Sequence, residues 1–170
     1  LAKEFDGEVI SADSRQVYKG MDIGTGKDIG KFSIFKFSNF QKKQLRLGYY
    51  LVNGIKIWLL DIVNPDYRFN VADYICCADV VLQDIKRQGK LPIIVGGTGF
   101  YIKGIVDGID TLGVPPDWEL RKKLSKYSIV ELSDCLKKAS LERWQKMNES
   151  DRKNPRRLIR AIEIATRSSK

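Results

Sequence analysis

Polar side chains that could act on a ligand follow a short β-branched run near the start of the chain. Glu8-Val9-Ile10 leads directly into Ser11-Ala12-Asp13-Ser14-Arg15-Gln16-Val17-Tyr18. Parallel α/β sheets bind ligands at the carboxyl ends of their strands, so a carboxylate at this position is a candidate general base. The plainer interpretation is that Asp13 and Ser14 cap a helix, because both residue types are favoured N-caps.

A second candidate segment lies far away in the sequence. The unbroken apolar run of residues 91–95 predicts a strand covered on both faces, and it is followed by Gly96-Gly97-Thr98-Gly99 and a helical pattern over residues 100–106. A strand, a glycine turn and a helix start form a geometry in which backbone N–H groups bind phosphate. The alternative is a tight turn that only lets the helix pack on the strand.

Cations are concentrated in the last third of the chain. Residues 115–170 hold 15 Lys and Arg against 8 Asp and Glu, whereas residues 1–114 hold 15 against 13. The final helix is expected to begin at Pro155, after an Asn154 cap, and it carries arginines beside its apolar stripe. Such arginines face either solvent or a polyanion, and charge alone does not choose between the two.

The elements that position these segments are those of an α/β chain. Residues 8–11 predict a strand, residues 1–5 predict the end of a helix, and Asn53-Gly54 predicts the two-residue turn of an inserted β-hairpin. Apolar spacings of three and four predict a helix over residues 70–88, with a capping box at its start and Gly89 at its end. After Pro115-Pro116 only helices are expected, near residues 117–126, 128–139 and 140–148.

Composition excludes several classes of site. The chain has no histidine, which rules out Ser-His-Asp and Cys-His catalysis, and its three cysteines lack the spacing of zinc ligands. No apolar run approaches the roughly 20 residues of a membrane span, and the start lacks a signal-peptide pattern. We therefore expect a cytoplasmic protein without a membrane partner.

Four segments, taken in this order, resemble the tRNA dimethylallyltransferases. They are residues 11–18, the Asp-Ile-Gly-Thr-Gly-Lys segment 22–27, residues 95–101 and residues 154–163. The resemblance implies an α/β fold whose P-loop-type parallel sheet core carries the β-hairpin and an all-helical, basic C-terminal part. Residues 1–114 and 151–170 would form the catalytic core, and residues 115–150 an RNA-binding insertion.

The activity that this resemblance implies is transfer of a dimethylallyl group from dimethylallyl diphosphate to N6 of the adenosine next to the anticodon in tRNA. Asp13 would take the proton from N6, Thr98 would hydrogen-bond the diphosphate, and Arg157 would bind the diphosphate from the last helix. The remaining implied substrate contacts are Ser14, Arg15, Gln16, Gly96, Gly97, Arg156 and Arg160. The implied cofactor is Mg²⁺, held through the diphosphate, and the implied partner of the monomer is the tRNA anticodon stem-loop.

The sequence also departs from the family pattern. The resemblance implies a preceding strand and a G-x-T-x-x-G-K-S/T loop, which this sequence lacks, so we expect the sequence as given to be inactive and its sheet to have unpaired edges. Where many relatives carry a histidine-rich stretch, residues 57–60 are Ile-Trp-Leu-Leu. Two alternatives stay open: an isopentenyltransferase that acts on free AMP, and a non-catalytic RNA-binding fragment.

Overall fold

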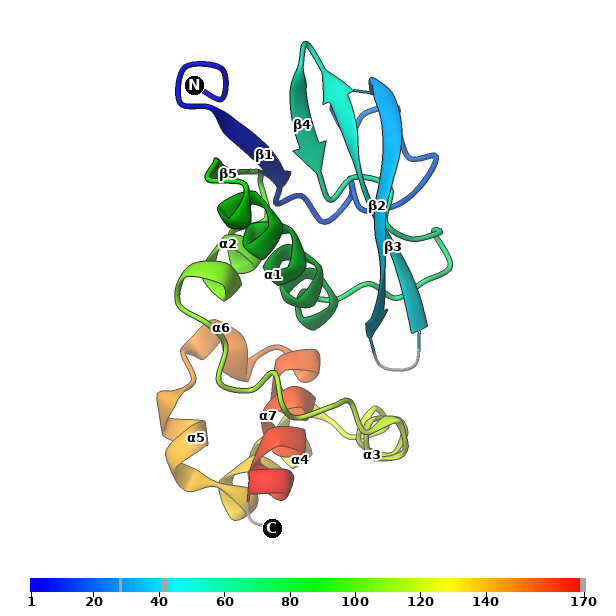
Figure 1. The fold of residues 1–170 in the computed structure, drawn as a ribbon. Coiled ribbons are helices and arrows are strands. Elements are labelled where there is room, and N and C mark those ends of the chain that lie inside the picture. Colours follow the sequence, from blue (N-terminus) through cyan, green and yellow to red (C-terminus); the bar gives the residue numbers. More distant parts are fainter. Residues whose placement is uncertain (28, 41–42, 169–170) are drawn as a thin grey trace. The chain divides into compact units, whose positions relative to one another are not determined.

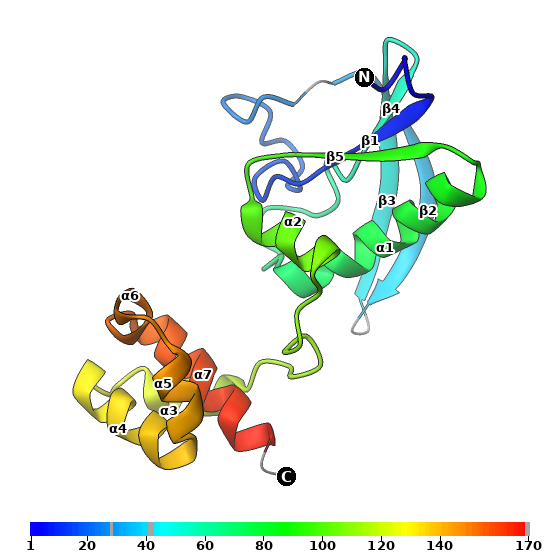
Figure 2. The same cartoon turned by 90° about the vertical axis from the view of Figure 1, so that its left-hand side faces the viewer.

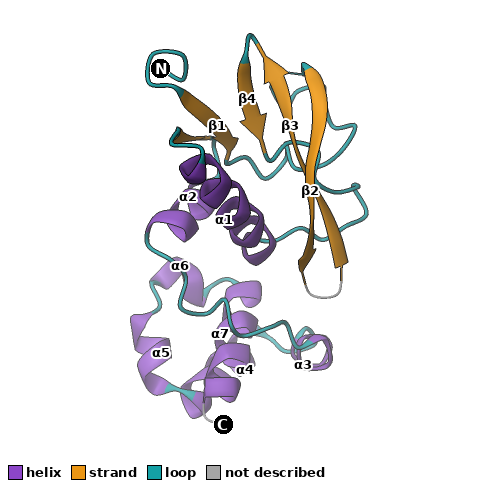
Figure 3. Cartoon of the chain, viewed as in Figure 1, coloured by secondary structure: helices purple, strands orange, loops and turns teal. Residues whose placement is uncertain are grey.

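Two compact units make up the chain. The computed structural model describes residues 1–27, 29–40 and 43–168, and it divides into Leu1–Ile109 and Asp110–Lys170. Within the described residues, all named strands belong to the first unit and the second is helical (Figures 1 and 3). None of the described helices has the length and apolar character needed to cross a membrane.

The first unit is a mixed sheet with helices. The sheet order is β2-β3-β4-β1-β5, in which β1 pairs in parallel with β4 and β5, while β3 pairs antiparallel with β2 and β4. Helix α1 lies along one face of this sheet (Figure 2). The expected α/β class and inserted hairpin are confirmed, with elements β1 (Gly7–Ser11), β2 (Lys31–Phe40), β3 (Lys43–Val52), β4 (Ile55–Trp58), α1 (Val71–Arg87), β5 (Leu91–Val95) and α2 (Gly99–Val106).

The turn between β3 and β4 has the predicted geometry. Val52 pairs with Ile55, so only two residues connect the strands. These residues, Asn53 and Gly54, have φ angles of 50° and 81°. Positive φ at both central positions defines a type I′ turn, whose twist matches that of the flanking strands. The Asn-Gly pair therefore fixes the register of β4 against β3.

Helix α1 begins and ends where the sequence predicts. Asn70 Oδ1 accepts hydrogen bonds from the backbone N–H groups of Ala72 and Asp73, and Asp73 Oδ2 accepts one from Asn70 N at 3.0 Å. Gly89 follows the helix with a φ of 71°. On the buried face, the Tyr74 hydroxyl donates to Ser11 O at 3.1 Å, which ties the helix to the carboxyl end of β1. The capping box and the apolar face thus place α1 beside the candidate site.

Three local expectations are wrong. Strand β5 is not covered on both faces, because Leu91 and Val95, which point to the same face of the strand, are 47% and 55% exposed. The start of the chain forms turns that end at Asp6, where φ is 44°, instead of the end of a helix. Residues 14–17 also form turns, so the plainer interpretation of Asp13 as a helix cap fails.

The second unit has a hydrophobic core of its own. Leu132, Leu136 and Leu158 are completely buried at its centre, where α4 and α7 pack together. Asn154 Oδ1 accepts hydrogen bonds from Arg156 N and Arg157 N, as expected for the cap of the last helix. The assignment of residues 151–170 to the catalytic core stays a prediction. The helices are α3 (Trp118–Leu124), α4 (Ile129–Ala139), α5 (Leu141–Lys146), the unpredicted four-residue α6 (Glu149–Arg152) and α7 (Pro155–Ser168).

A buried carboxylate joins α7 to the start of α3. The fully buried Glu163 accepts hydrogen bonds from Arg121 Nε at 2.9 Å and Arg121 Nη2 at 2.7 Å, and also from Asp117 N and Arg160. Burial alone would raise the pKa of Glu163, but these donors outweigh burial and lower the pKa to about 2.

Acid should therefore weaken the second unit. The folded pKa of about 2 lies below the ordinary value of 4.5, so Glu163 stabilises the fold above pH 4.5 and loses this contribution as the pH falls towards 2. The loss should amount to about 3 kcal/mol. Urea unfolding followed by helical circular dichroism across this pH range measures it. Glu163→Gln should flatten the pH dependence, whereas Glu142→Gln, at an exposed position, should leave it steep; equal profiles would contradict the assignment.

Candidate functional site

The loops after β1 and β5 lie side by side at one edge of the sheet. Ala12 N donates to Val95 O at 2.7 Å, and Thr98 N donates to Ala12 O at 3.0 Å. A third bond runs from Ser14 N to Thr98 Oγ1 at 2.9 Å. The structure thus brings together the acidic segment and the glycine-threonine segment, which are more than eighty residues apart in sequence.

Gly96 and Gly97, which follow β5, differ in the space available for a side chain. A Cβ atom on Gly96 would lie 2.3 Å from the carbonyl carbon and oxygen of Ala12, so the backbones touch and no side chain fits. A Cβ on Gly97 would meet only Asp13 Oδ2, at 3.8 Å, which is ordinary contact. Gly96 is therefore required by packing, whereas Gly97 leaves open the space next to the Asp13 carboxylate.

Asp13 is held by one oxygen and leaves the other available. Its Oδ1 accepts hydrogen bonds from Arg15 N at 2.8 Å and Gln16 N at 3.3 Å. Among the described residues no donor reaches Oδ2, which faces the Gly97 position. A carboxylate fixed in this way presents one oriented oxygen to a ligand, as a general base requires.

The three residues after Asp13 have unequal surroundings. Ser14 and Arg15 are exposed, while Gln16 is half-buried. The Gln16 side chain accepts a hydrogen bond from Ser11 Oγ at 2.6 Å and donates one to Thr25 O at 2.8 Å. Gln16 therefore anchors the loop that follows, and the adenosine contacts of all three residues stay predictions.

The side chain of Lys27 stabilises the loop that follows β1. Its side chain is completely buried, and its ammonium donates to Tyr18 O at 2.7 Å, Asp22 Oδ1 at 2.9 Å and Asp61 Oδ1 at 2.6 Å. The Tyr50 hydroxyl donates to the other Asp61 oxygen at 2.6 Å, and burial and this carboxylate raise the pKa of Tyr50. The sequence predicts no role for Lys27, because a lysine between Gly26 and Asp28 carries no sign of burial.

Thr98 has a hydroxyl proton left to donate. Its Oγ1 accepts from Ser14 N and makes no capping bond to α2, so the proton can point to an anion. Thr98→Ala should weaken diphosphate binding by about 1–3 kcal/mol, the usual cost of losing a hydrogen bond to a charged group. Competition by inorganic diphosphate measures this loss. Thr98→Ser should retain the affinity; an unchanged inhibition constant in the alanine variant would contradict the role.

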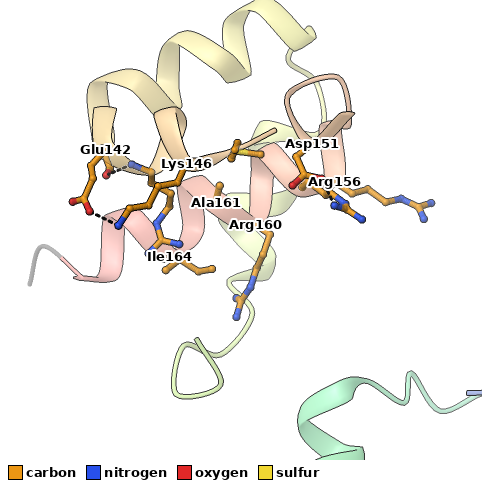
Figure 4. A pocket seen from close by; sticks show the side chains of 11 residues that line it. Glu142, Lys146, Asp151, Arg156, Arg160, Ala161 and Ile164 are labelled. Atoms are coloured by element: carbon orange, nitrogen blue, oxygen red, sulfur yellow. Dashed lines mark hydrogen bonds and ion pairs between the residues drawn. The ribbon is translucent and has the colours of Figure 1, made fainter. Parts of the chain in front are cut away.

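The predicted arginines line a cavity in the second unit. This cavity of about 500 Å³ lies between α5 and α7, and Arg156, Arg157 and Arg160 all contribute to its wall. Figure 4 shows Arg156 and Arg160 on α7 with Lys146 on α5, which pairs with Glu142 at 2.6 Å. The cavity wall also includes Ala161 and Ile164, so cations surround an apolar floor.

These arginines differ in how much they are already bound. Arg160 pairs with Glu163 and donates to Thr111 O at 3.1 Å and Val114 O at 2.9 Å, so it secures the chain before α3. Arg157 pairs with Asp151. Their contacts with diphosphate or tRNA stay predictions. Sequence reasoning missed Arg143 and Lys146, which line the same cavity and whose spacing of three on one helix could have indicated a shared face.

Metal binding finds little support from protein side chains. Within the described ranges no group of three or more His, Cys, Asp or Glu side chains could hold a metal ion. Mg²⁺ commonly keeps several waters and binds through substrate phosphates with one or two carboxylates. The described residues therefore do not form a site for the ion by themselves, and Mg²⁺ held through the diphosphate stays a prediction.

The chain is similar to known proteins along nearly all of its length. A family model described as IPP transferase matches residues 40–170. The tRNA dimethylallyltransferase 1 proteins of Parabacteroides distasonis and Geotalea uraniireducens are 40% and 38% identical over 166 and 165 residues. These matches cover 96% and 97% of the chain and 47% of each relative, so the chain spans about half their length.

The chain is also similar to solved structures. A tRNA isopentenylpyrophosphate transferase from Bacillus halodurans matches 97% of this chain and 48% of its own, with 32% identity and a TM-score of 0.51. A eukaryotic dimethylallyltransferase acting on tRNA matches 100% of this chain and 38% of its own, with 25% identity and a TM-score of 0.73. These likenesses confirm the expected P-loop-type α/β fold class. With a family model that matches residues 40–170, the chain belongs to the IPP transferase family.

Proposed function

We propose that the protein transfers a dimethylallyl group from dimethylallyl diphosphate to N6 of the adenosine next to the anticodon in tRNA. The observation that carries this proposal is the hydrogen bond from Ser14 N to Thr98 Oγ1 at 2.9 Å. This bond joins the loop after β1, which carries the base Asp13, to the loop after β5, which carries hydrogen-bond donors for an anion. The names of the relatives, which are tRNA dimethylallyltransferases, support the same reaction.

The proposed step forms one bond and breaks one. N6 of adenosine attacks the terminal carbon of the dimethylallyl group, and the bond from that carbon to the diphosphate oxygen breaks, so the electron pair leaves with the diphosphate. The proton of N6 passes to Asp13 Oδ2, the oxygen that no described residue occupies. An exocyclic adenine amine is a weak nucleophile, so orientation and proton removal both lower the barrier.

Negative charge grows on the leaving diphosphate. The Thr98 hydroxyl and the open backbone at Gly97 lie next to Asp13 and would donate to this anion. Fixed donors that meet developing charge lower the barrier directly. A diphosphate-bound Mg²⁺ would add positive charge to the same group, and a contact of Arg157 with the diphosphate stays a prediction.

The second unit would bind the RNA. Residues 115–170 carry most of the net charge of +9, and a base next to the anticodon must leave its stack before it can react. RNA affinity should therefore fall steeply as salt rises, because each Lys or Arg contact with a phosphate releases a counterion. Fluorescence anisotropy of a labelled stem-loop measures the slope. A flat salt dependence would count against RNA binding by the basic helices. We place the reaction in the cytoplasm and expect a monomer.

The decisive experiment compares two acceptors. The full-length protein is incubated with dimethylallyl diphosphate and either an anticodon stem-loop or AMP, and mass spectrometry detects the product. We expect prenylated stem-loop and little prenylated AMP. Prenylation of AMP alone would establish the free-nucleotide alternative, and stem-loop binding without transfer would establish the non-catalytic one.

A further inference from the structure

Two cations outside the Asp13 site line a pair of neighbouring cavities in the first unit. Lys19 follows the loop after β1, and its backbone N–H donates to Val63 O at 2.8 Å. Arg46 lies on β3. Both residues line a cavity of about 350 Å³ that also includes Asn64 and Tyr67, and both line a second cavity of about 340 Å³. These side chains are therefore shared by two adjoining hollows.

Arg46 is held in place by an aromatic ring. Its guanidinium lies over the ring of Phe32, 4.7 Å from the ring centre. Its Nε atom is buried and has no hydrogen-bond partner within the part of the chain that the structure describes. A buried charged donor without an acceptor is unfavourable, and buried polar groups nearly always have partners. Because Arg46 lines both cavities, an anion in either one would offset the charge of its guanidinium.

The nearby acids do not neutralise these cations. Asp22 and Asp61 line the second cavity, but both are bound to Lys27, at 2.9 Å and 2.6 Å. Asp66 lines the first cavity and is exposed. Over the described ranges, neither Lys19 nor Arg46 has a carboxylate within ion-pair distance.

The pair lies at the same edge of the sheet as Asp13. Strands β1 and β4 run in parallel with Ile10 opposite Trp58, and Trp58 pairs with Tyr49 of the antiparallel β3. Arg46 precedes Tyr49 on β3, and this strand continues past the carboxyl end of β4 (Figure 1). A substrate that reaches Asp13 with one nucleotide could therefore place another phosphate near Arg46.

We propose that Lys19 and Arg46 bind a backbone phosphate of the RNA substrate. The inference rests on the proposed function and names a further contact for it. The planar guanidinium, fixed over Phe32, can give two parallel hydrogen bonds to phosphate oxygens, and the Lys19 ammonium adds a second charge. A second anion site apart from the reacting groups suits a nucleotide whose phosphate lies away from N6, and the positive charge of residues 115–170 favours a polynucleotide over AMP.

The test measures stem-loop affinity of the full-length protein across a range of salt concentrations. Arg46→Gln and Lys19→Gln should each weaken binding by about tenfold at physiological salt and lower the slope of log affinity against log salt by about one. Arg46→Lys should keep the slope and lose part of the affinity, because lysine keeps the positive charge but cannot give two parallel hydrogen bonds. The matched control is Arg87→Gln, an exposed position at the end of α1, which should change neither quantity.

Each outcome decides between the claims. If both glutamine variants match Arg87→Gln, the phosphate site is wrong, while prenylation of the stem-loop by the unaltered protein would still support the proposed function. If the affinity for AMP falls as much as that for the stem-loop, the phosphate belongs to a mononucleotide and the RNA assignment is wrong. If the unaltered protein neither binds nor prenylates the stem-loop, the proposed function itself fails.

Discussion

Asp13→Asn is expected to lower the rate of prenyl transfer by at least a hundredfold while stem-loop affinity stays within a few fold. Asparagine keeps an oxygen that can accept from Arg15 N and Gln16 N, so the turn after β1 should survive. It cannot take the N6 proton, and removing a general base typically costs a factor of about 10² to 10⁴. Single-turnover transfer to the stem-loop measures the loss without interference from product release.

Two comparisons make this result specific to proton removal. Asp13→Ala removes the turn bonds as well, so it should be as inactive as Asp13→Asn and less stable to urea. Asp107→Asn changes a carboxylate that pairs with Lys103 on the surface of α2, and it should leave the rate unchanged. Transfer at the ordinary rate by Asp13→Asn would remove Asp13 from the mechanism.

Lys27→Met should cost about 3–5 kcal/mol of unfolding free energy, because it leaves the largely buried Asp61 carboxylate without its cation. The Lys27 side chain is completely buried, and the Asp61 side chain is only 12% exposed. Urea unfolding measured by tryptophan fluorescence reports on this unit through Trp58, the only tryptophan in residues 1–109, once Trp118 and Trp144 are replaced by phenylalanine. The loop that carries Thr25 should become more mobile, and the hydrogen bond from Gln16 to Thr25 O should weaken.

Controls separate burial from mere loss of charge. Lys103→Met breaks a surface pair with Asp107 and should cost less than about 1 kcal/mol. Adding Asp61→Leu to Lys27→Met should recover much of the stability, because the unpaired charge disappears with it. An equal effect of Lys27→Met and Lys103→Met would show that the buried network contributes little.

Local patterns explain why so much of the fold was predictable. The Asn53-Gly54 turn, the Asn70 capping box and the Asn154 cap each depend on residues within a few positions, so the sequence carries them directly. The exposure of β5 depends on what packs against the faces of the sheet, and no local pattern records that. Helix α6 has only four residues, too few for an apolar period to be visible.

The site was predictable where function requires unusual residues. Asp13 and Thr98 follow strands and belong to motifs, and the structure places their loops in contact. Lys27 and Arg46 were not predictable, because their importance comes from burial among residues from distant parts of the chain. A polar side chain looks the same in sequence whether it faces solvent or lies in a satisfied network, and only the fold distinguishes the two cases.

The contact between Gly96 and Ala12 changes how a glycine motif should be interpreted. Any other residue at position 96 would place a carbon atom within 2.3 Å of a peptide group from another segment. Substitutions at position 96 would therefore prevent correct folding, whatever their effect on catalysis. If Gly96 is invariant among homologous sequences, the contact between two backbones explains it. Gly97 has room for a methyl group, so an invariant glycine at that position would indicate that a ligand needs the space.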